Sequence, residues 1–175
     1  MNVASGHHWL HLLRHAKSSW ADAELDDHDR PLAPRGEKSV RRIGEYLAAA
    51  AHLPELVLCS SARRTTMTLA GITPALPAGA ETSIEGPLYG ASGGELLERL
   101  RRVSDDVDGV MLIGHNPGLE DLAQLLVGSG DASLRARLTT KYPTGALATM
   151  SFSGSWAGLG PDRATLEAYV VPRDL

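Results

Sequence analysis

This chain has little cysteine and no long apolar segment. The single cysteine, Cys59, cannot form an internal disulfide, and its place in an apolar run predicts a small buried side chain. No apolar run approaches the roughly 18 residues that a membrane-spanning helix needs. Residues 1–6 lack the basic and apolar parts of a secretory signal. We therefore expect a cytoplasmic protein with no membrane partner.

The chain also lacks an excess of basic residues. Its 17 lysines and arginines are outnumbered by 21 aspartates and glutamates, which gives a formal net charge of −4 at pH 7. A net negative charge provides no general attraction to nucleic acid. Any site for an anion must therefore be a local concentration of arginine and histidine.

Histidine and cysteine do not cluster as metal ligands do. His7, His11 and His15 are spaced four residues apart, which on a helix would place them on one face. The surrounding apolar pattern predicts a strand instead, where residues four apart are too distant to share one ion. We expect neither a metal nor a cofactor.

What the chain does have is an ordinary globular composition. Its 175 residues are 43% hydrophobic and 22% charged, with no internal repeat or linker, which predicts a single domain over residues 1–175. Apolar runs predict strands at residues 9–13, 56–59, 82–84, 110–113, 146–152 and 166–171. Helical spacing and caps predict helices at residues 37–51, 62–70, 93–103 and 119–127. This alternation predicts an α/β protein, a three-layer α/β/α sandwich around a mostly parallel central sheet.

Three of the predicted strands end in residues suited to phosphate chemistry. Arg14-His15 follows the first strand, Ser60-x-x-x-Arg64 the second, and Gly114-His115 the one at residues 110–113. The carboxyl ends of parallel strands meet at one edge of a sheet, where such folds place their chemistry. Two histidines and two arginines at one edge suit the transfer of a phosphoryl group through a histidine.

In these segments the chain resembles the histidine phosphatase (phosphoglycerate mutase-like) superfamily, and within it the small SixA-like phosphohistidine phosphatases. The resemblance extends over about residues 10–152. Supporting matches are Asp29-Arg30-Pro31-Leu32-x-x-Arg35-Gly36, Leu88-Tyr89-x-Ala91 and Tyr142-Pro143-Thr144-Gly145-Ala146. The resemblance implies a phosphoglycerate mutase-like fold and a phosphatase activity that needs no metal.

The resemblance also implies roles for particular residues. His15 would be the nucleophile, since a neutral imidazole nitrogen can attack phosphorus and form a phosphohistidine. Arg14 and Arg64 would hold the phosphate, because guanidinium groups fit phosphate oxygens in pairs. Arg64 is chosen over Arg63 because it stands four residues after the serine, as in the family. His115 would be the second histidine of the pocket.

Other assignments rest on less. Ser18 and Asn116 are expected to bind substrate, because they lie close to His15 and His115 in the chain. Glu85 is a candidate for the acid that protonates a leaving group, although an exposed loop glutamate would explain it as well. Ala16 replaces the glycine that most of the superfamily carries after Arg-His, and a methyl group is compatible with negative φ.

The expected function is hydrolysis of a phosphorylated substrate, most plausibly protein phosphohistidine, through a covalent intermediate on His15. The short segment after Tyr89 leaves little room for a lid, which favours a bulky partner such as a phosphorylated protein. Two alternatives remain open at this level. One is a promiscuous phosphomonoesterase acting on small substrates such as sugar phosphates or nucleotides, and the other is a non-catalytic scaffold that binds phosphorylated partners.

Overall fold

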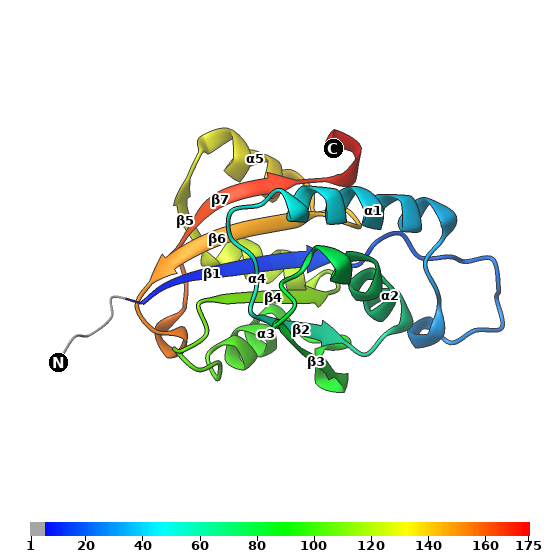
Figure 1. Ribbon diagram of the computed structural model, residues 1–175, viewed down its shortest axis with the longest axis horizontal. Helices are drawn as coiled ribbons and strands as arrows, with labels where there is room; N and C mark the ends of the chain where they lie inside the picture. The colour runs from blue at the N-terminus through cyan, green and yellow to red at the C-terminus, as the bar shows by residue number, and fades with distance from the viewer. Residues whose placement is uncertain (1–5) are drawn as a thin grey trace.

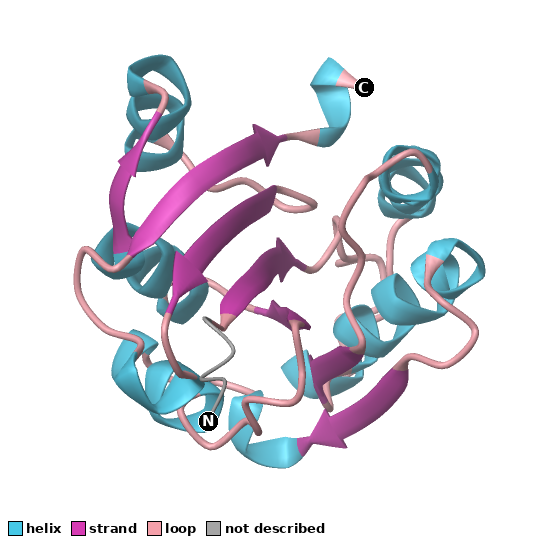
Figure 2. Cartoon of the chain, turned by 60° about the vertical axis from the view of Figure 1, so that its left-hand side comes forward, coloured by secondary structure: helices cyan, strands magenta, loops and turns pink. Residues whose placement is uncertain are grey.

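A computed structural model describes residues 6–175. Residues 1–5, part of the N-terminal segment in which no secretory signal is expected, lie outside the described residues. One seven-stranded sheet runs through the molecule, with helices on both of its faces (Figure 2). The predicted three-layer α/β fold is confirmed.

The strand order is β3-β2-β4-β1-β6-β7-β5. The strands are β1 (His7–Arg14), β2 (Leu56–Ser60), β3 (Glu81–Glu85), β4 (Gly109–Gly114), β5 (Val127–Gly130), β6 (Leu147–Ser153) and β7 (Ala164–Val170). The pairs β1–β4, β2–β4, β2–β3 and β5–β7 are parallel, and β6 is antiparallel to both of its neighbours. The sheet is therefore mostly parallel, as predicted.

The α-helices are α1 (Pro34–Ala48), α2 (Arg63–Ile72), α3 (Gly93–Leu100), α4 (Gly118–Leu126) and α5 (Ala132–Thr140). Buried side chains of α1 and α2 pack on one face of the sheet, and those of α3, α4 and α5 pack on the other. Ser92 caps α3 through the reciprocal hydrogen bonds with Glu95 that its sequence predicts.

Successive residues of the central strands alternate between these two cores. Leu12 and Leu112 belong to the core under α3 and α4, whereas Leu13 and Ile113 belong to the core under α1 and α2. Because both faces are covered, these strands read as continuous apolar runs in the sequence. Their ends are therefore well defined, and so is the place where the polar motifs begin.

Two elements were not predicted from the sequence. Gly128-Ser129-Gly130, which reads as the end of a helix, forms the edge strand β5 after α4 ends at Leu126. α5 follows, with the Asp131 carboxylate accepting from the backbone N–H groups of Ser133 and Leu134. Both segments are short, and in α5 only Leu138 is buried, so neither carries a periodic apolar pattern.

No helix of residues 6–175 has the length and apolar character needed to cross a membrane. Within the same residues, no three histidine, cysteine, aspartate or glutamate side chains are arranged to hold a metal ion.

Candidate active site

Strand register brings the three predicted motifs to one edge of the sheet. In the parallel pair β1–β4, Arg14 stands opposite Gly114, so His15 and His115 follow at the same level. Cys59 of β2 stands opposite Ile113, which places Ser60 level with Arg14 and Gly114. The arrowheads of β1, β2 and β4 in Figure 1 all point to this edge, beyond which the loop between β1 and α1 extends.

His15 is buried at this edge with one ring nitrogen occupied. Its Nδ1–H donates to the carbonyl oxygen of Ala16 at 2.7 Å, which leaves Nε2 with a free lone pair. Burial lowers the pKa of His15 to about 3, and the charges of Arg64 and Arg14 add to this effect. The ring is therefore neutral at pH 7, as a nitrogen nucleophile must be.

His115 lies beside His15, with a distance of 5.2 Å between the two ring centroids. Its Nε2 is 2.7 Å from Ser60 Oγ. Burial is the main cause that lowers the pKa of His115 to about 4, and Arg64 lowers it further. A neutral His115 has one N–H to offer to an oxygen atom.

Two arginines belong to this edge of the sheet: Arg14 at the end of β1 and Arg64 in the first turn of α2. Arg64 is buried whereas its neighbour Arg63 is exposed, so the structure places Arg64 and not Arg63 at this edge. One guanidinium nitrogen of Arg14 donates to the carbonyl oxygen of Tyr142 at 2.9 Å. Its Nε is buried and has no hydrogen-bond partner among the described residues.

The loop that carries His15 is fixed by close backbone contacts on both sides. The N–H of Gly145 donates to the carbonyl oxygens of Arg14 and His15 at 3.1 and 3.0 Å. Gly145 has φ +77°, which favours glycine. On the other side, a Cβ at Gly36 would lie 2.1 Å from the carbonyl oxygen of Lys17, so only glycine lets α1 pack this closely.

The geometry thus places a neutral histidine with a free ring nitrogen next to two guanidinium groups and a second neutral histidine. Unpartnered buried donors are uncommon in folded proteins and are often explained by a ligand. Arg14 Nε and His115 Nδ1 are two such buried atoms without a partner among the described residues. The arrangement suits an anionic group that is attacked by nitrogen while its charge is held by arginine.

Comparison with known proteins agrees with this chemistry. Residues 10–86 match the profile of the histidine phosphatase superfamily (branch 1). The protein Rv1276c of Mycobacterium tuberculosis, which is uncharacterized, is 37% identical over 169 residues that cover 92% of this chain and all of the relative. The chain belongs to the histidine phosphatase superfamily.

Solved structures place it among the SixA-like members. A protein of Nakamurella multipartitia proposed to be a phosphohistidine phosphatase SixA superposes with a TM-score of 0.83 at 29% identity, covering 96% of this chain and 98% of its own. A corresponding protein of Agrobacterium tumefaciens gives 0.79 at 28% identity, covering 94% and 98%. The chain is a SixA-like histidine phosphatase.

The structure adds Asp27 to the site, a residue that the sequence analysis did not single out. Arg64 donates to the carbonyl oxygen of Asp27 at 2.7 Å and to its Oδ2 at 3.0 Å. Tyr89 donates its hydroxyl to Oδ2 at 2.6 Å, and Arg30 donates to Oδ1 at 2.8 Å. The hydrogen bond from Tyr89, followed by that from Arg64, lowers the pKa of Asp27 to about 2.

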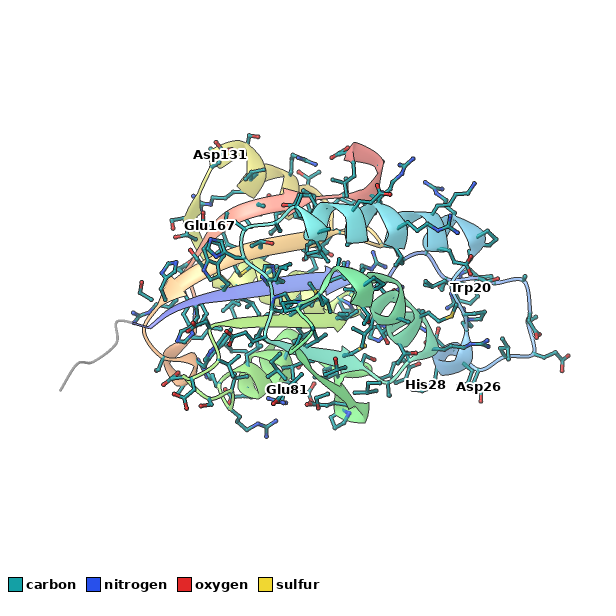
Figure 3. All side chains as sticks on the ribbon, viewed as in Figure 1. Trp20, Asp26, His28, Glu81, Asp131 and Glu167 are labelled. Atoms are coloured by element: carbon teal, nitrogen blue, oxygen red, sulfur yellow. The ribbon has the colours of Figure 1, made fainter. Side chains whose placement is uncertain are left out.

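Arg30 joins the loop to Ser18. Its guanidinium is buried, donates to Ser18 Oγ and to the carbonyl oxygen of Ser19, and stacks on the exposed Trp20 ring at 3.3 Å from the ring centroid. Ser18 Oγ accepts from Arg30, so its own hydrogen remains free for another acceptor. Figure 3 labels Trp20 and His28 on this loop, beyond the end of β1.

Asn116 and Glu85 are engaged elsewhere. The side-chain amide of Asn116 donates to Glu120 at 3.0 Å and to the carbonyl oxygen of Tyr142 at 2.9 Å, which uses both of its hydrogens. Glu85 accepts two hydrogen bonds of 2.8 Å from Arg99 and one from Ser83. The pairing with Arg99 lowers the pKa of Glu85, whereas a general acid needs a raised one.

The sequence pointed to Arg30 and Tyr89 but not to Asp27. Arg30 and Tyr89 lie within supporting family matches, so their positions were visible but their tasks were not. Asp27 is one of five acidic residues between positions 22 and 29, and nothing in the sequence separates it from the others. Only the path of the loop over α2 selects it.

Proposed function

We propose that this chain is a phosphohistidine phosphatase in which His15 takes the phosphoryl group from a phosphorylated protein. The observation that carries the proposal is the state of the site's groups: a neutral His15 with Nε2 free, next to Arg14 and Arg64, and, among residues 6–175, no carboxyl group placed to act as an acid.

In the first step, His15 Nε2 attacks phosphorus while the bond from phosphorus to the substrate's imidazole nitrogen breaks. The leaving imidazole keeps the bonding electron pair, and a proton already on its other nitrogen makes it a neutral leaving group. Arg14, Arg64 and an N–H of His115 stabilise the charge on the phosphoryl oxygens. Positioning and charge stabilisation of this kind account for most catalysis of phosphoryl transfer.

In the second step, water attacks the phosphorus of phospho-His15. The bond from phosphorus to Nε2 breaks, the electron pair returns to the ring, and inorganic phosphate leaves as H2PO4⁻ with both protons of the water. The hydrogen bond from Nδ1 to Ala16 keeps the ring in one tautomer and one orientation through both steps.

The absence of a suitable acid favours this substrate over an alkyl phosphate. Among the described residues, Asp27 is held ionised with a pKa of about 2, and Glu85 is paired with Arg99. An alkoxide leaving group needs a proton from an acid, whereas a protonated imidazole does not. A site without such an acid therefore supports cleavage of a labile P–N bond.

A substrate panel tests the proposal directly. We expect kcat/KM to be highest for a phosphohistidine protein, measurable for an activated aryl phosphate, and low for phosphoserine peptides and sugar phosphates. Faster hydrolysis of a sugar phosphate than of phosphohistidine would refute the assignment and favour a small-molecule phosphomonoesterase. Binding without turnover of any substrate would favour a scaffold.

A further inference from the structure

A second feature of the surface is a groove of about 740 Å³ between α1, α5 and the C-terminal turn η5 (Pro172–Asp174). Figure 1 shows the C-terminus lying beside α1, and Arg42 of α1 donates to the carbonyl oxygen of Pro172 at 3.2 Å. The groove lies at the edge of the sheet where β1 and β7 end, as His15 does, but none of the four motif residues lines it.

The groove gathers positive charge from a chain that is negative overall. Its lining includes all three lysines of the sequence and four of the arginines. They are Lys17, Arg35, Lys38, Arg42, Arg137, Lys141 and Arg173, and each is exposed. Against a net charge of −4, seven cations around one depression form a strong local field.

Most of these cations are free of internal partners. Within residues 6–175, Arg137 and Arg173 contact the carboxylate of Asp174, and the other five form no ion pair. At the active-site edge, by contrast, Arg30 and Arg64 are both bound to Asp27. The groove therefore has positive charges that no internal carboxylate neutralises and that can attract an external anion.

The floor of the groove is apolar. Tyr169 and Val171 are buried beneath it, and Pro143 and Pro172 form part of its walls. A free inorganic anion would gain no binding energy from contact with these apolar side chains. A segment of polypeptide that carries acidic side chains and some apolar ones matches both the floor and the rim.

Residues that line the groove lie close in the chain to residues of the active-site edge. Lys17 is two residues after His15, and Lys141 and Pro143 flank Tyr142, whose carbonyl oxygen accepts from Arg14. A chain bound in the groove would therefore lie beside the pocket that contains His15.

We propose that this groove docks an acidic segment of the phosphorylated protein and so presents its phosphorylated residue to His15. The inference deepens the proposed function and rests on it for the identity of the substrate. The groove would act through association, raising the capture of the correct partner, while the chemistry would stay with His15 and its neighbours.

The test uses two charge-reversal variants of equal net charge. In the first, Lys38→Glu is combined with Lys141→Glu, two exposed side chains of the groove that form no hydrogen bond or ion pair within residues 6–175. In the matched control, Arg41→Glu is combined with Arg163→Glu, two exposed arginines outside the groove. Thermal unfolding of both variants verifies that they fold.

Binding is measured by fluorescence anisotropy with a labelled, unphosphorylated peptide rich in glutamate and leucine, at two salt concentrations. A second peptide replaces every glutamate by glutamine. We expect the acidic peptide to bind wild type and control, to lose at least about tenfold in affinity on the groove variant, and to bind less tightly at higher salt. The glutamine peptide should bind none of them appreciably.

Turnover separates this inference from the proposed function. All three proteins should hydrolyse an aryl phosphate equally, because the substitutions lie outside the catalytic pocket. A phosphohistidine placed in the acidic peptide should be hydrolysed with a lower kcat/KM only by the groove variant. If phosphohistidine is not hydrolysed although the acidic peptide binds as expected, the proposed function fails and the docking groove stands.

Two results would overturn the docking inference. One is equal affinity of the acidic peptide for the groove variant and for the control, including no binding to any protein. The other is concentration-dependent self-association in light scattering that the groove variant abolishes, with no peptide binding, which would show that the groove holds a second copy of the chain.

Discussion

The active-site edge and the groove beside it use the same kind of side chain in opposite ways. At the edge, Arg30 and Arg64 are buried and each is tied to Asp27, and His15 is kept neutral. In the groove, arginines and lysines are exposed and mostly unpaired. Buried and paired groups keep the fixed geometry that chemistry requires, whereas exposed and unpaired groups favour long-range attraction that salt can screen.

The comparison predicts that hydrolysis of the phosphate depends wholly on residues of the active-site edge. His15→Ala should lower kcat for an aryl phosphate by on the order of 10³ or more, because the Nε2 of the neighbouring neutral histidine, His115, is already in contact with Ser60 Oγ. Circular dichroism should show an unchanged fold, since a residue in the loop after β1 adds little to the core. Activity of the variant within a few fold of wild type would break the comparison.

The next largest effect should come from Arg64, the arginine proposed to hold the phosphate. Arg64→Ala should reduce kcat/KM by about 10² to 10³, the usual effect of losing one strong donor to the transition state. Arg63→Ala is the matched control, because Arg63 is adjacent but exposed, and its loss should matter far less. Steady-state kinetics of the two variants decide the point, and the reverse order would mean that Arg63 holds the phosphate.

Asp27 offers a way to sharpen the comparison. Its carboxylate binds the guanidinium group of Arg64, which is proposed to bind the incoming phosphate. Asp27→Asn removes one negative charge at nearly constant shape, so the inhibition constant of vanadate should fall by roughly three- to tenfold. Weaker inhibition would show instead that the main task of Asp27 is to hold Arg64 in position.

The pH dependence of stability should reflect the buried histidines. Burial lowers the pKa of His11 to about 4, as it lowers those of His15 and His115 to about 3 and 4, from the usual 6.5. Below pH 6.5 the unfolded chain takes up protons that the folded chain does not. The free energy of unfolding should thus be highest above that pH and fall steadily towards pH 4.

Urea denaturation at several pH values measures this slope. The variant that combines Lys38→Glu with Lys141→Glu should retain the slope contributed by the histidines, since neither lysine lies among them. Stability that stays constant or rises as the pH falls over this range would contradict the burial of neutral histidines.

The sequence was informative wherever a buried strand ended in a polar motif. The apolar runs before Arg14, Ser60 and Gly114 located three neighbouring strands, and parallel register then brought their ends together. Nothing comparable marked β5 and α5, because an edge strand of four residues and a helix with one buried side chain carry no periodic pattern.

The site itself was less predictable than the strands. Asp27 contacts Arg64 across 37 positions of sequence, and the pairing depends on the path of an irregular loop. Glu85 lies at the end of β3, where an acid could stand, but the partner Arg99 on α3 binds its carboxylate. The groove was not predicted at all, because its cations come from α1, α5, η5 and the loops that follow β1 and α5.

The most direct test of the account is to trap the covalent intermediate. Single-turnover reaction with a labelled aryl phosphate, quenched rapidly in alkali, should give a phosphoenzyme that is stable to base and labile to acid. Peptide mapping should place the label on His15, and His15→Ala should give none. Hydrolysis in a single turnover without label on His15 at any time, or with label on His115, would contradict the account.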